Sequence, residues 1–287
     1  MKRQLSYQSV KVRARNALGL LRDSPRLFLL KAKRKAFRNP LSRHGQPMVR
    51  MGDVRFRIDF EFAPVMKSMY DRLYEIETEY IIRRLLRSGG TFVDVGANIG
   101  YLSAVALSVV GKRGKVLSFE PAPRYFERLQ EFWRLNPEHD VRLYRHALGD
   151  AEGETTLNLT GSRNIGWNTV VPGLMRTDEI GEAVVVRVRR LDTVLHEAQI
   201  SKADFIKIDV EGYEFPVLKG CSEFLAAVKP PILCEIAPVA YPKLGLSLEV
   251  LEQFMRELSY TACHVVSLMP IELHRLQRTQ NVVFLPQ

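Results

Sequence analysis

The sequence predicts an α/β fold built on a doubly wound, mostly parallel sheet. From residue 91 onward, short apolar segments alternate with longer segments of helical periodicity, and repeated βα units imply a parallel sheet covered on both faces. A glycine-containing turn follows the first apolar segment and opens a helix. The 287 residues, 46% of them hydrophobic, are enough for one large domain plus an extension.

The segment ahead of this alternation is expected to be a basic extension followed by short elements. Residues 1–45 mix basic and apolar side chains in a pattern compatible with helix. A short extended stretch is expected at Val54–Phe60. Apolar side chains at helical spacing predict a helix over Glu75–Leu86, which the sequence Ser88-Gly89-Gly90 ends.

The alternation itself gives the remaining elements. Main strands are expected at Thr91–Val95, Lys115–Phe119, Val141–Ala147, Phe205–Val210, Ile232–Ile236, Thr261–Val266 and Asn281–Leu285. Helices are expected at Ile99–Val110, Pro123–Leu135, Leu191–Ala198, Glu214–Val228 and Leu248–Leu258. Two further strands, Glu154–Leu159 and Ala183–Arg189, interrupt the rhythm. The last two main strands have no helix between them, which permits a closing antiparallel pair.

The charge is unevenly distributed along the chain. Residues 1–57 contain 16 Lys and Arg against two acids, a net +14, whereas the whole chain carries +10, so the remainder carries −4. We therefore divide the chain into a basic N-terminal extension, residues 1–50, and a main domain, residues 51–287. A mildly acidic main domain argues against a long nucleic-acid groove.

Cysteine usage and hydropathy favour a cytoplasmic protein. The three cysteines are scattered and form no CxxC pair, which is typical of a reducing compartment. No apolar run approaches the roughly 20 residues that a membrane span requires. The basic N-terminus is not followed by a long apolar segment, so it does not have the pattern of a secretory signal.

The strongest local motif is the segment Asp94-Val-Gly-Ala-Asn-Ile-Gly100, which joins a strand to a helix. Glycines allow a tight turn and a close approach of the backbone to a ligand. A dinucleotide fingerprint would have glycine in place of Asp94 and a narrower glycine spacing. A carboxylate suits a cationic amino-acid ligand better than pyrophosphate, so we expect Asp94, Gly96, Asn98 and Gly100 to bind S-adenosylmethionine. A plain strand–turn–helix corner is the alternative.

Two acids follow the next two strands. Glu120 stands about 20 residues after the glycine turn, where an acid can accept hydrogen bonds from both ribose hydroxyls. It serves a nicotinamide cofactor equally well. Asp150, in Ala147-Leu-Gly-Asp150, is a candidate for a hydrogen bond from the adenine amino group, although Gly-Asp also forms ordinary turns.

Charged residues interrupt the strand expected at Phe205–Val210. Buried charges are costly unless paired, so Lys207 and Asp209 indicate either a salt bridge or a functional site. Asp209 and Glu211 fall at the carboxyl end of this strand, where ligands bind in open α/β sheets. Glu235 ends the next strand and is a candidate for the same rim.

Taken together, these residues resemble the FkbM family of S-adenosylmethionine-dependent methyltransferases. The resemblance covers roughly Glu75 to Val266. It is carried by four segments, Phe92–Gly100, Phe119–Pro121, Ala147–Asp150 and above all Ile206–Glu214 with Val217–Gly220 behind it.

The resemblance implies a class I methyltransferase (Rossmann-like) fold of seven strands, the last inserted antiparallel. It also implies methyl transfer, usually to a hydroxyl of a sugar, glycolipid, polyketide or similar metabolite. Asn168 lies in a segment similar to the substrate-proximal loop of the family, although Trp167-Asn168-Thr169 departs from the small, Ser-rich version. Asp209 and Glu211 are the candidates for the base that removes the acceptor proton, and Lys207 could stabilise an alkoxide or anchor Asp209. We expect no metal.

Two other functions fit the sequence less well. A nicotinamide-dependent oxidoreductase would share the acid at Glu120, but the glycine spacing counts against it. A non-catalytic relative would use the basic extension to hold RNA or an anionic membrane. For residues 1–45 we expect either a peripheral contact with an anionic membrane or a helical cap over the substrate pocket. Nucleic acid is the weakest expectation, because few aromatic residues are present there to stack on bases.

Overall fold

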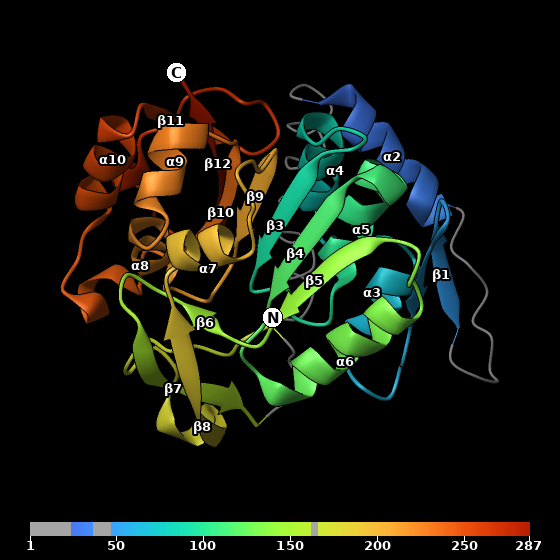
Figure 1. The fold of residues 1–287 in the computed structure, drawn as a ribbon, viewed down its shortest axis with the longest axis horizontal. Helices are drawn as coiled ribbons and strands as arrows, with labels where there is room; N and C mark the ends of the chain where they lie inside the picture. The colour runs from blue at the N-terminus through green and yellow to red at the C-terminus, as the bar shows by residue number, and fades with distance from the viewer. Residues whose placement is uncertain (1–23, 37–46, 162–165) are drawn as a thin grey trace, which may run out of the picture.

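The computed structural model describes residues 24–36, 47–161 and 166–287, and its centre is a seven-stranded sheet (Figure 1). The strand order is β11-β12-β10-β9-β3-β4-β5. In chain order these are β3 (Thr91–Val95), β4 (Lys115–Phe119), β5 (Asp140–Tyr144), β9 (Phe205–Ile208), β10 (Ile232–Ile236), β11 (Tyr260–His264) and β12 (Gln280–Pro286). β12 pairs antiparallel with both β10 and β11, and the other neighbours are parallel. The doubly wound, Rossmann-like fold of class I methyltransferases expected from the sequence is confirmed.

Helices cover both faces of this sheet. They are α2 (Pro25–Ala36), α3 (Met66–Tyr70), α4 (Ile76–Leu85), α5 (Tyr101–Val110), α6 (Pro123–Arg134), α7 (Leu191–Glu197), α8 (Glu214–Lys219), α9 (Ser222–Val228) and α10 (Leu248–Glu257). One core lies between the sheet and α4, α5 and α6, and the other between the sheet and α7 to α10 (Figure 1). Successive strand residues alternate between them, because side chains of a strand point to opposite faces. Phe92 belongs to the first core and Val93 to the second.

The strand order reverses beside β3, and this reversal positions the site. From β3 the chain builds outward through β4 and β5 in one direction, then returns to β9 and β10 on the other side of β3. In open α/β sheets the crevice at the carboxyl ends of the strands on either side of such a reversal binds ligands. The loops after β3, β4, β9 and β10 are therefore the ones that meet at the expected site.

Two smaller sheets complete the fold. β1 (Met48–Met51) pairs with β2 (Val54–Arg57), which occupies the first part of the extended stretch expected there. β7 (Gly153–Thr160) and β8 (Ile180–Arg189) form the antiparallel pair expected between the third main strand and the short helix, and β6 (Ala147–Leu148) joins β8. The strand expected over Val141–Ala147 is therefore two strands in two different sheets.

The helix expected over Glu214–Val228 was wrong, because α8 and α9 are separate helices. The chain breaks at Gly220, whose backbone lies against the carbonyl of Gly149 from the β6 segment. A Cβ atom at Gly220 would stand 1.9 Å from that carbonyl oxygen. The break thus comes from a tertiary contact that no local periodicity reveals.

α2 is the part of the basic extension that the structure describes. It packs on α4, and its Leu27 is fully buried. The rest of the segment predicted to contact a membrane or cap the pocket, residues 1–23 and 37–45, lies outside the described residues. The boundary at residue 50 stays a prediction. No helix in the described ranges is long and apolar enough to cross a membrane.

Candidate functional site

A cavity of about 250 Å³ opens at the carboxyl ends of β3, β4, β9 and β10. The segments Val95–Ile99 and Phe119–Pro121 form one side, which we call the cofactor wall. Asp209, Glu211 and Glu235 also line the cavity, and we call these three, together with lining residues from other parts of the chain, the acceptor wall. The cavity therefore lies where the strand-order reversal places it.

Gly96 lies at the tightest point of the glycine loop. Its φ is +78°, and a Cβ atom there would stand 1.9 Å from the backbone oxygen of Asp209. Only glycine fits such an approach between two strand ends. Gly100 begins α5 with a φ of +85°, and a Cβ there would stand 2.7 Å from Leu129. Gly100 is not among the residues that line the cavity, so its role is to shape the loop.

The backbone N–H groups from Gly96 to Gly100 all donate to acceptors within the protein. The acceptors are the Phe119 carbonyl for Gly96 and Ala97, the Glu120 carboxylate for Asn98, the Asn98 side chain for Ile99 and the Ala97 carbonyl for Gly100. A dinucleotide site instead presents free backbone N–H groups to a pyrophosphate. The loop therefore offers close backbone approach but no anion cradle.

Glu120 follows β4 in the cofactor wall, and two hydrogen bonds fix its carboxylate. One carboxylate oxygen accepts the N–H of Asn98 and the other the N–H of Ala122, both at 2.8 Å. Burial raises the pKa of Glu120 to about 7 despite these two bonds. Each carboxylate oxygen has further lone-pair capacity, so the group can accept hydrogen bonds from a pair of ligand hydroxyls.

The sequence analysis expected Asp94 to contact a ligand, but its side chain does not reach the cavity. Its side chain is fully buried and is not part of the cavity lining. One oxygen accepts the hydroxyl of Ser103 at 2.6 Å, and the other lies 3.4 Å from the ammonium of Lys207. Asp94 points inward between β3 and α5, so it secures other residues and is not placed to bind a ligand.

Lys207 is the cation of the acceptor wall, and its bonds are directed inward. Its ammonium donates to the Gly96 carbonyl at 2.8 Å and lies 3.4 Å from the carboxylates of both Asp94 and Asp209. Burial alone would lower the pKa of Lys207, but the two aspartates outweigh it and raise that pKa. Of the two roles considered for Lys207, this geometry favours anchoring Asp209.

The acceptor wall is crowded with carboxylates. Oxygens of Asp209, Glu211 and Glu235 lie within 4.8 Å of one another. Burial, then the charge of Asp209, raises the pKa of Glu211 well above its ordinary value and the pKa of Glu235 to about 8. Such a cluster can hold protons, hydroxyl donors or a divalent cation, which prefers carboxylate oxygens. The sequence positions 209, 211 and 235 match no recognised metal spacing, which is why the sequence analysis expected no metal.

The insertion between β6 and α7 closes one side of the acceptor wall. Asn168 lines the cavity, as expected for a substrate residue, and its side-chain oxygen accepts the N–H of Thr160 at 3.1 Å. The hydroxyl of the neighbouring Thr169 donates to the Glu211 carbonyl at 2.7 Å. Glu211 has a φ of +53°, so this bond helps to hold a strained residue in place.

Several placements differ from the sequence analysis. Asp150 is not among the lining residues, since it pairs with Lys219 at 2.6 Å, and this position does not support an adenine contact. Conversely, Tyr74 and Glu75 line the cavity, although only a helix was expected there. His146 also lines it. No local motif marks these residues, because each reaches the cavity through tertiary packing.

Comparisons with known proteins identify the family of the chain. Residues 94–262 match the model of the methyltransferase FkbM domain. The methyltransferase sdnD of Sordaria araneosa is 32% identical over 200 residues, which cover 57% of this chain and 76% of that protein. The hexuronic acid methyltransferase AglP of Haloferax volcanii is 27% identical over 162 residues, covering 55% of this chain and 62% of that protein.

A solved FkbM methyltransferase from Methylobacillus flagellatus KT is similar with a TM-score of 0.43 and 18% identity, covering 93% of this chain and 60% of that one. The chain thus spans less than two thirds of that protein and of AglP. The domain match takes in the glycine loop, Glu120, Lys207 and the whole carboxylate cluster. The chain belongs to the FkbM methyltransferase family.

Proposed function

We propose that the protein transfers a methyl group from S-adenosylmethionine to a hydroxyl of a sugar, glycolipid, polyketide or similar metabolite. The observation that carries this proposal is the pairing of two unlike walls in one cavity. The cofactor wall has no free backbone N–H in its glycine loop but has a rigid hydroxyl acceptor, Glu120. The acceptor wall is rich in carboxylates. A nucleoside that carries a positive charge instead of phosphates would fit both walls, because its ribose hydroxyls can bind Glu120 and its charge is attracted by the carboxylates.

The residues of the cofactor wall fit S-adenosylmethionine. Glu120 would hold the ribose hydroxyls, and Gly96 allows the loop to pass close to the backbone of Asp209 at the end of β9. The bound cofactor supplies the electrophilic methyl group, so the protein mainly aligns the acceptor with it. The carboxylates of the acceptor wall would favour the positive charge of the sulfonium.

The acceptor wall supplies the proton chemistry. Asp209 is the proposed base, and Lys207 holds its carboxylate in place. The raised pKa of Glu211 keeps that group protonated near neutral pH, so it can donate a hydrogen bond to the acceptor. Carboxylates accept hydrogen bonds from hydroxyls, which favours a hydroxyl-rich acceptor. The relative AglP, named for hexuronic acid, supports an acceptor of the sugar class.

Titration calorimetry tests the cofactor. We expect S-adenosylmethionine and S-adenosylhomocysteine to bind, and Glu120→Ala to weaken both by about 1–3 kcal/mol, because the ribose hydroxyls lose their partner. NADH should not bind. Binding of NADH without binding of the methyl donor would refute the proposal. Turnover of labelled cofactor against glycans, lipids and polyketides then identifies the acceptor.

We also propose that the outer face of α2 contacts an anionic membrane, most simply at its cytoplasmic side. Arg26, Lys33 and Lys35 are exposed there, and Leu29 between them is 63% exposed. Each basic residue near an anionic leaflet contributes about 1 kcal/mol. None of the residues 24–36 lines the cavity, so α2 is not a cap over it.

Vesicle co-sedimentation tests this surface. At low salt the full chain should sediment with phosphatidylserine vesicles and not with neutral ones. Replacing Arg26, Lys33 and Lys35 together by glutamine should release most of the protein from the vesicles. Equal recovery of the wild type with both kinds of vesicle would show that the proposed contact does not exist.

A further inference from the structure

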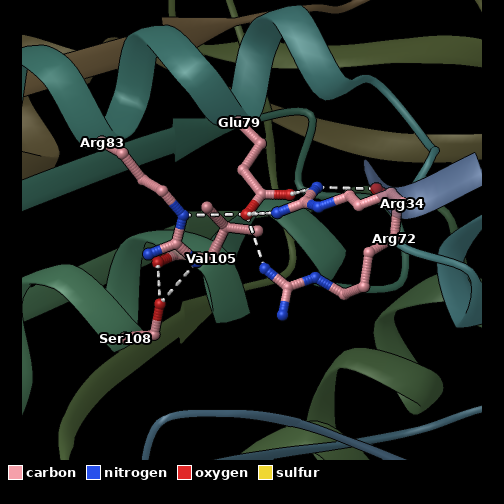
Figure 2. A network of polar contacts seen from close by, with 6 residues as sticks. All are labelled: Arg34, Arg72, Glu79, Arg83, Val105 and Ser108. Atoms are coloured by element: carbon pink, nitrogen blue, oxygen red, sulfur yellow. Dashed lines mark hydrogen bonds and ion pairs between the residues drawn. The ribbon is translucent and has the colours of Figure 1, made fainter. Parts of the chain in front are cut away.

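Glu79 on α4 is a fully buried carboxylate surrounded by three arginines (Figure 2). The donors are Arg34 at 2.8 and 3.0 Å, Arg72 at 2.5 Å and Arg83 at 2.8 Å. Burial would raise the pKa of Glu79, but the hydrogen bond from Arg34 and the charges of Arg72 and Arg34 lower it to about 2. The carboxylate is therefore charged at any physiological pH, and the cluster is a permanent junction.

This junction connects the basic extension to the body of the protein. Arg34 comes from α2, Arg72 from the turn after α3, and Arg83 from the next turn of α4 (Figure 2). Arg83 also donates to the hydroxyl of Ser108 on α5 at 3.1 Å. Three separate segments thus meet at one carboxylate, α5 joins them through Arg83, and Arg34 is the contribution of the extension.

Arg34 also holds the backbone of the turn at residues 71–75. The same guanidinium nitrogen that binds Glu79 donates to the carbonyl of Arg72 at 2.6 Å. Arg72 and Glu75 both have left-handed backbones, with φ of +57° and +39°. Such residues cost roughly 1–3 kcal/mol each and persist only where the surroundings fix them. Arg34 on α2 fixes this turn through its hydrogen bond to the Arg72 carbonyl.

The other end of the turn faces the cavity. Tyr74 and Glu75 line it, and the charge of Asp209 acts on both of them. The ring of Tyr74 packs edge-on against Tyr101 at 5.5 Å between centroids, and Tyr101 lines the cavity too. A change at Arg34 would therefore be transmitted through five residues of backbone to the acceptor wall.

We propose that Arg34 is a positioning residue for the acceptor wall, which locks the 71–75 turn in the conformation that presents Tyr74 and Glu75 to the cavity. The proposal rests on the function proposed above, since it assumes that this wall receives the acceptor. The basic extension then supports the methyl-transfer site through Arg34, although none of residues 24–36 lines the cavity.

The chain offers a matched control on the same helix. Lys31 pairs with Glu77 at 2.6 Å and also joins α2 to α4. That pair is more exposed than the Arg34–Glu79 pair, and among the described residues Lys31 makes no hydrogen bond or ion pair with the 71–75 turn. Lys31→Gln thus removes a helix–helix ion pair without touching the turn. Arg34→Lys keeps the charge but cannot make the bidentate contact.

Hydrogen exchange measured by mass spectrometry tests the proposal on the full chain. The N–H groups of Leu73 and Tyr74 both donate to the Ser68 carbonyl. We expect Arg34→Gln to speed exchange in the peptide that contains them by about tenfold or more, with Arg34→Lys in between and Lys31→Gln unchanged. Strands β3 and β4 should exchange as in the wild type. Unchanged exchange at the turn, or equal acceleration in β3 and β4, overturns the proposal.

Phenol ionisation adds a readout that a purely structural role would not move. Burial, with Glu75 and Asp209 nearby, holds the pKa of Tyr74 above its ordinary value. In Arg34→Gln, absorbance at about 295 nm should show one additional tyrosine ionising near pH 10, and adding Tyr74→Phe should remove it. Absence of this signal also overturns the proposal. S-adenosylhomocysteine affinity should stay within about threefold of wild type, since the cofactor wall is untouched. Failure of the wild type to bind it would refute the proposed function instead.

Discussion

The two walls of the cavity are built in different ways. The cofactor wall comes mainly from two neighbouring strand ends, 95–99 and 119–121, whose polar groups bond to one another. The acceptor wall gathers Tyr74, Glu75, Gly166, Asn168, Lys207, residues 209–211 and Glu235. Its carboxylates outnumber its lysine, and that lysine is already bonded inward. The first wall is complete without a ligand, whereas the second is electrostatically unbalanced until protons or a ligand arrive.

This difference predicts that binding and chemistry can be separated by mutation. Residues of the self-contained wall should govern how tightly the cofactor binds. Residues of the unbalanced wall should govern the acceptor and its proton. Lys207 and Gly96 connect the walls, through the 2.8 Å bond between the ammonium of the first and the carbonyl of the second. Substitutions at that junction should affect both properties.

The largest expected effect is on turnover in Asp209→Asn. The amide keeps the shape of the carboxylate but cannot accept a proton, so methyl transfer should fall by about 100- to 10,000-fold. Affinity for S-adenosylmethionine should fall by much less than turnover, because Asp209 is only one of the carboxylates proposed to favour the sulfonium charge. Labelled-methyl transfer and calorimetry measure the two quantities, with Glu120→Ala as the opposite case. Equal losses of affinity in the two variants would mean that the walls are not distinct.

The same difference explains what the sequence could predict. The cofactor wall follows two short motifs at strand ends, so the placement of Gly96 and Glu120 at the cavity could be predicted from order and spacing alone. Asp94 belongs to the motif of Gly96 but is turned inward to Ser103 and Lys207, and a motif does not reveal burial. Its side chain was therefore expected at the cavity but is not among those that line it.

The acceptor wall was predictable only where its residues end strands. Asp209, Glu211 and Glu235 could be placed by that rule. Glu75 could not, because it reaches the cavity through the packing of α4 against α5, far away in the sequence. Asp150 was misplaced for a related reason. Its segment leaves the main sheet for β6, and the ion pair with Lys219 holds it outside.

A smaller effect, on stability, is expected from Gly96→Ala at the junction of the walls. Its matched control is Gly89→Ala. Both glycines have nearly the same positive φ, +78° for Gly96 and +77° for Gly89. A methyl group added at Gly89 would have no atom within 4 Å, whereas one added at Gly96 would stand 1.9 Å from the backbone oxygen of Asp209. Backbone strain alone should cost the control about 1–2 kcal/mol. Gly96→Ala should lose about 3 kcal/mol or more, because two strand ends must separate. Urea unfolding at one pH compares them, and equal losses would contradict the close approach.

The smallest effect concerns Glu235 and the charge imbalance itself. Burial, then the charges of Asp209 and Glu214, raises the pKa of Glu235 to about 8. Between the ordinary carboxyl range and pH 8, the folded protein binds a proton that the unfolded chain has released. Stability contributed by this group is therefore present at low pH and lost as pH rises through that window.

Glu235→Gln removes this ionisation, so the free energy of unfolding of the variant should rise relative to that of the wild type as pH rises. From pH 5 to pH 8.5 we expect a relative gain of about 1–3 kcal/mol in the free energy of unfolding, with chelator present so that no divalent cation neutralises the wall. The surface variant Glu127→Gln controls for loss of a negative charge on its own. If both variants track the wild type across this range, Glu235 is not held protonated by its neighbours, and the acceptor wall is no less balanced than the cofactor wall. A gain confined to Glu235→Gln would place the imbalance at the strand end where the acceptor is expected to bind.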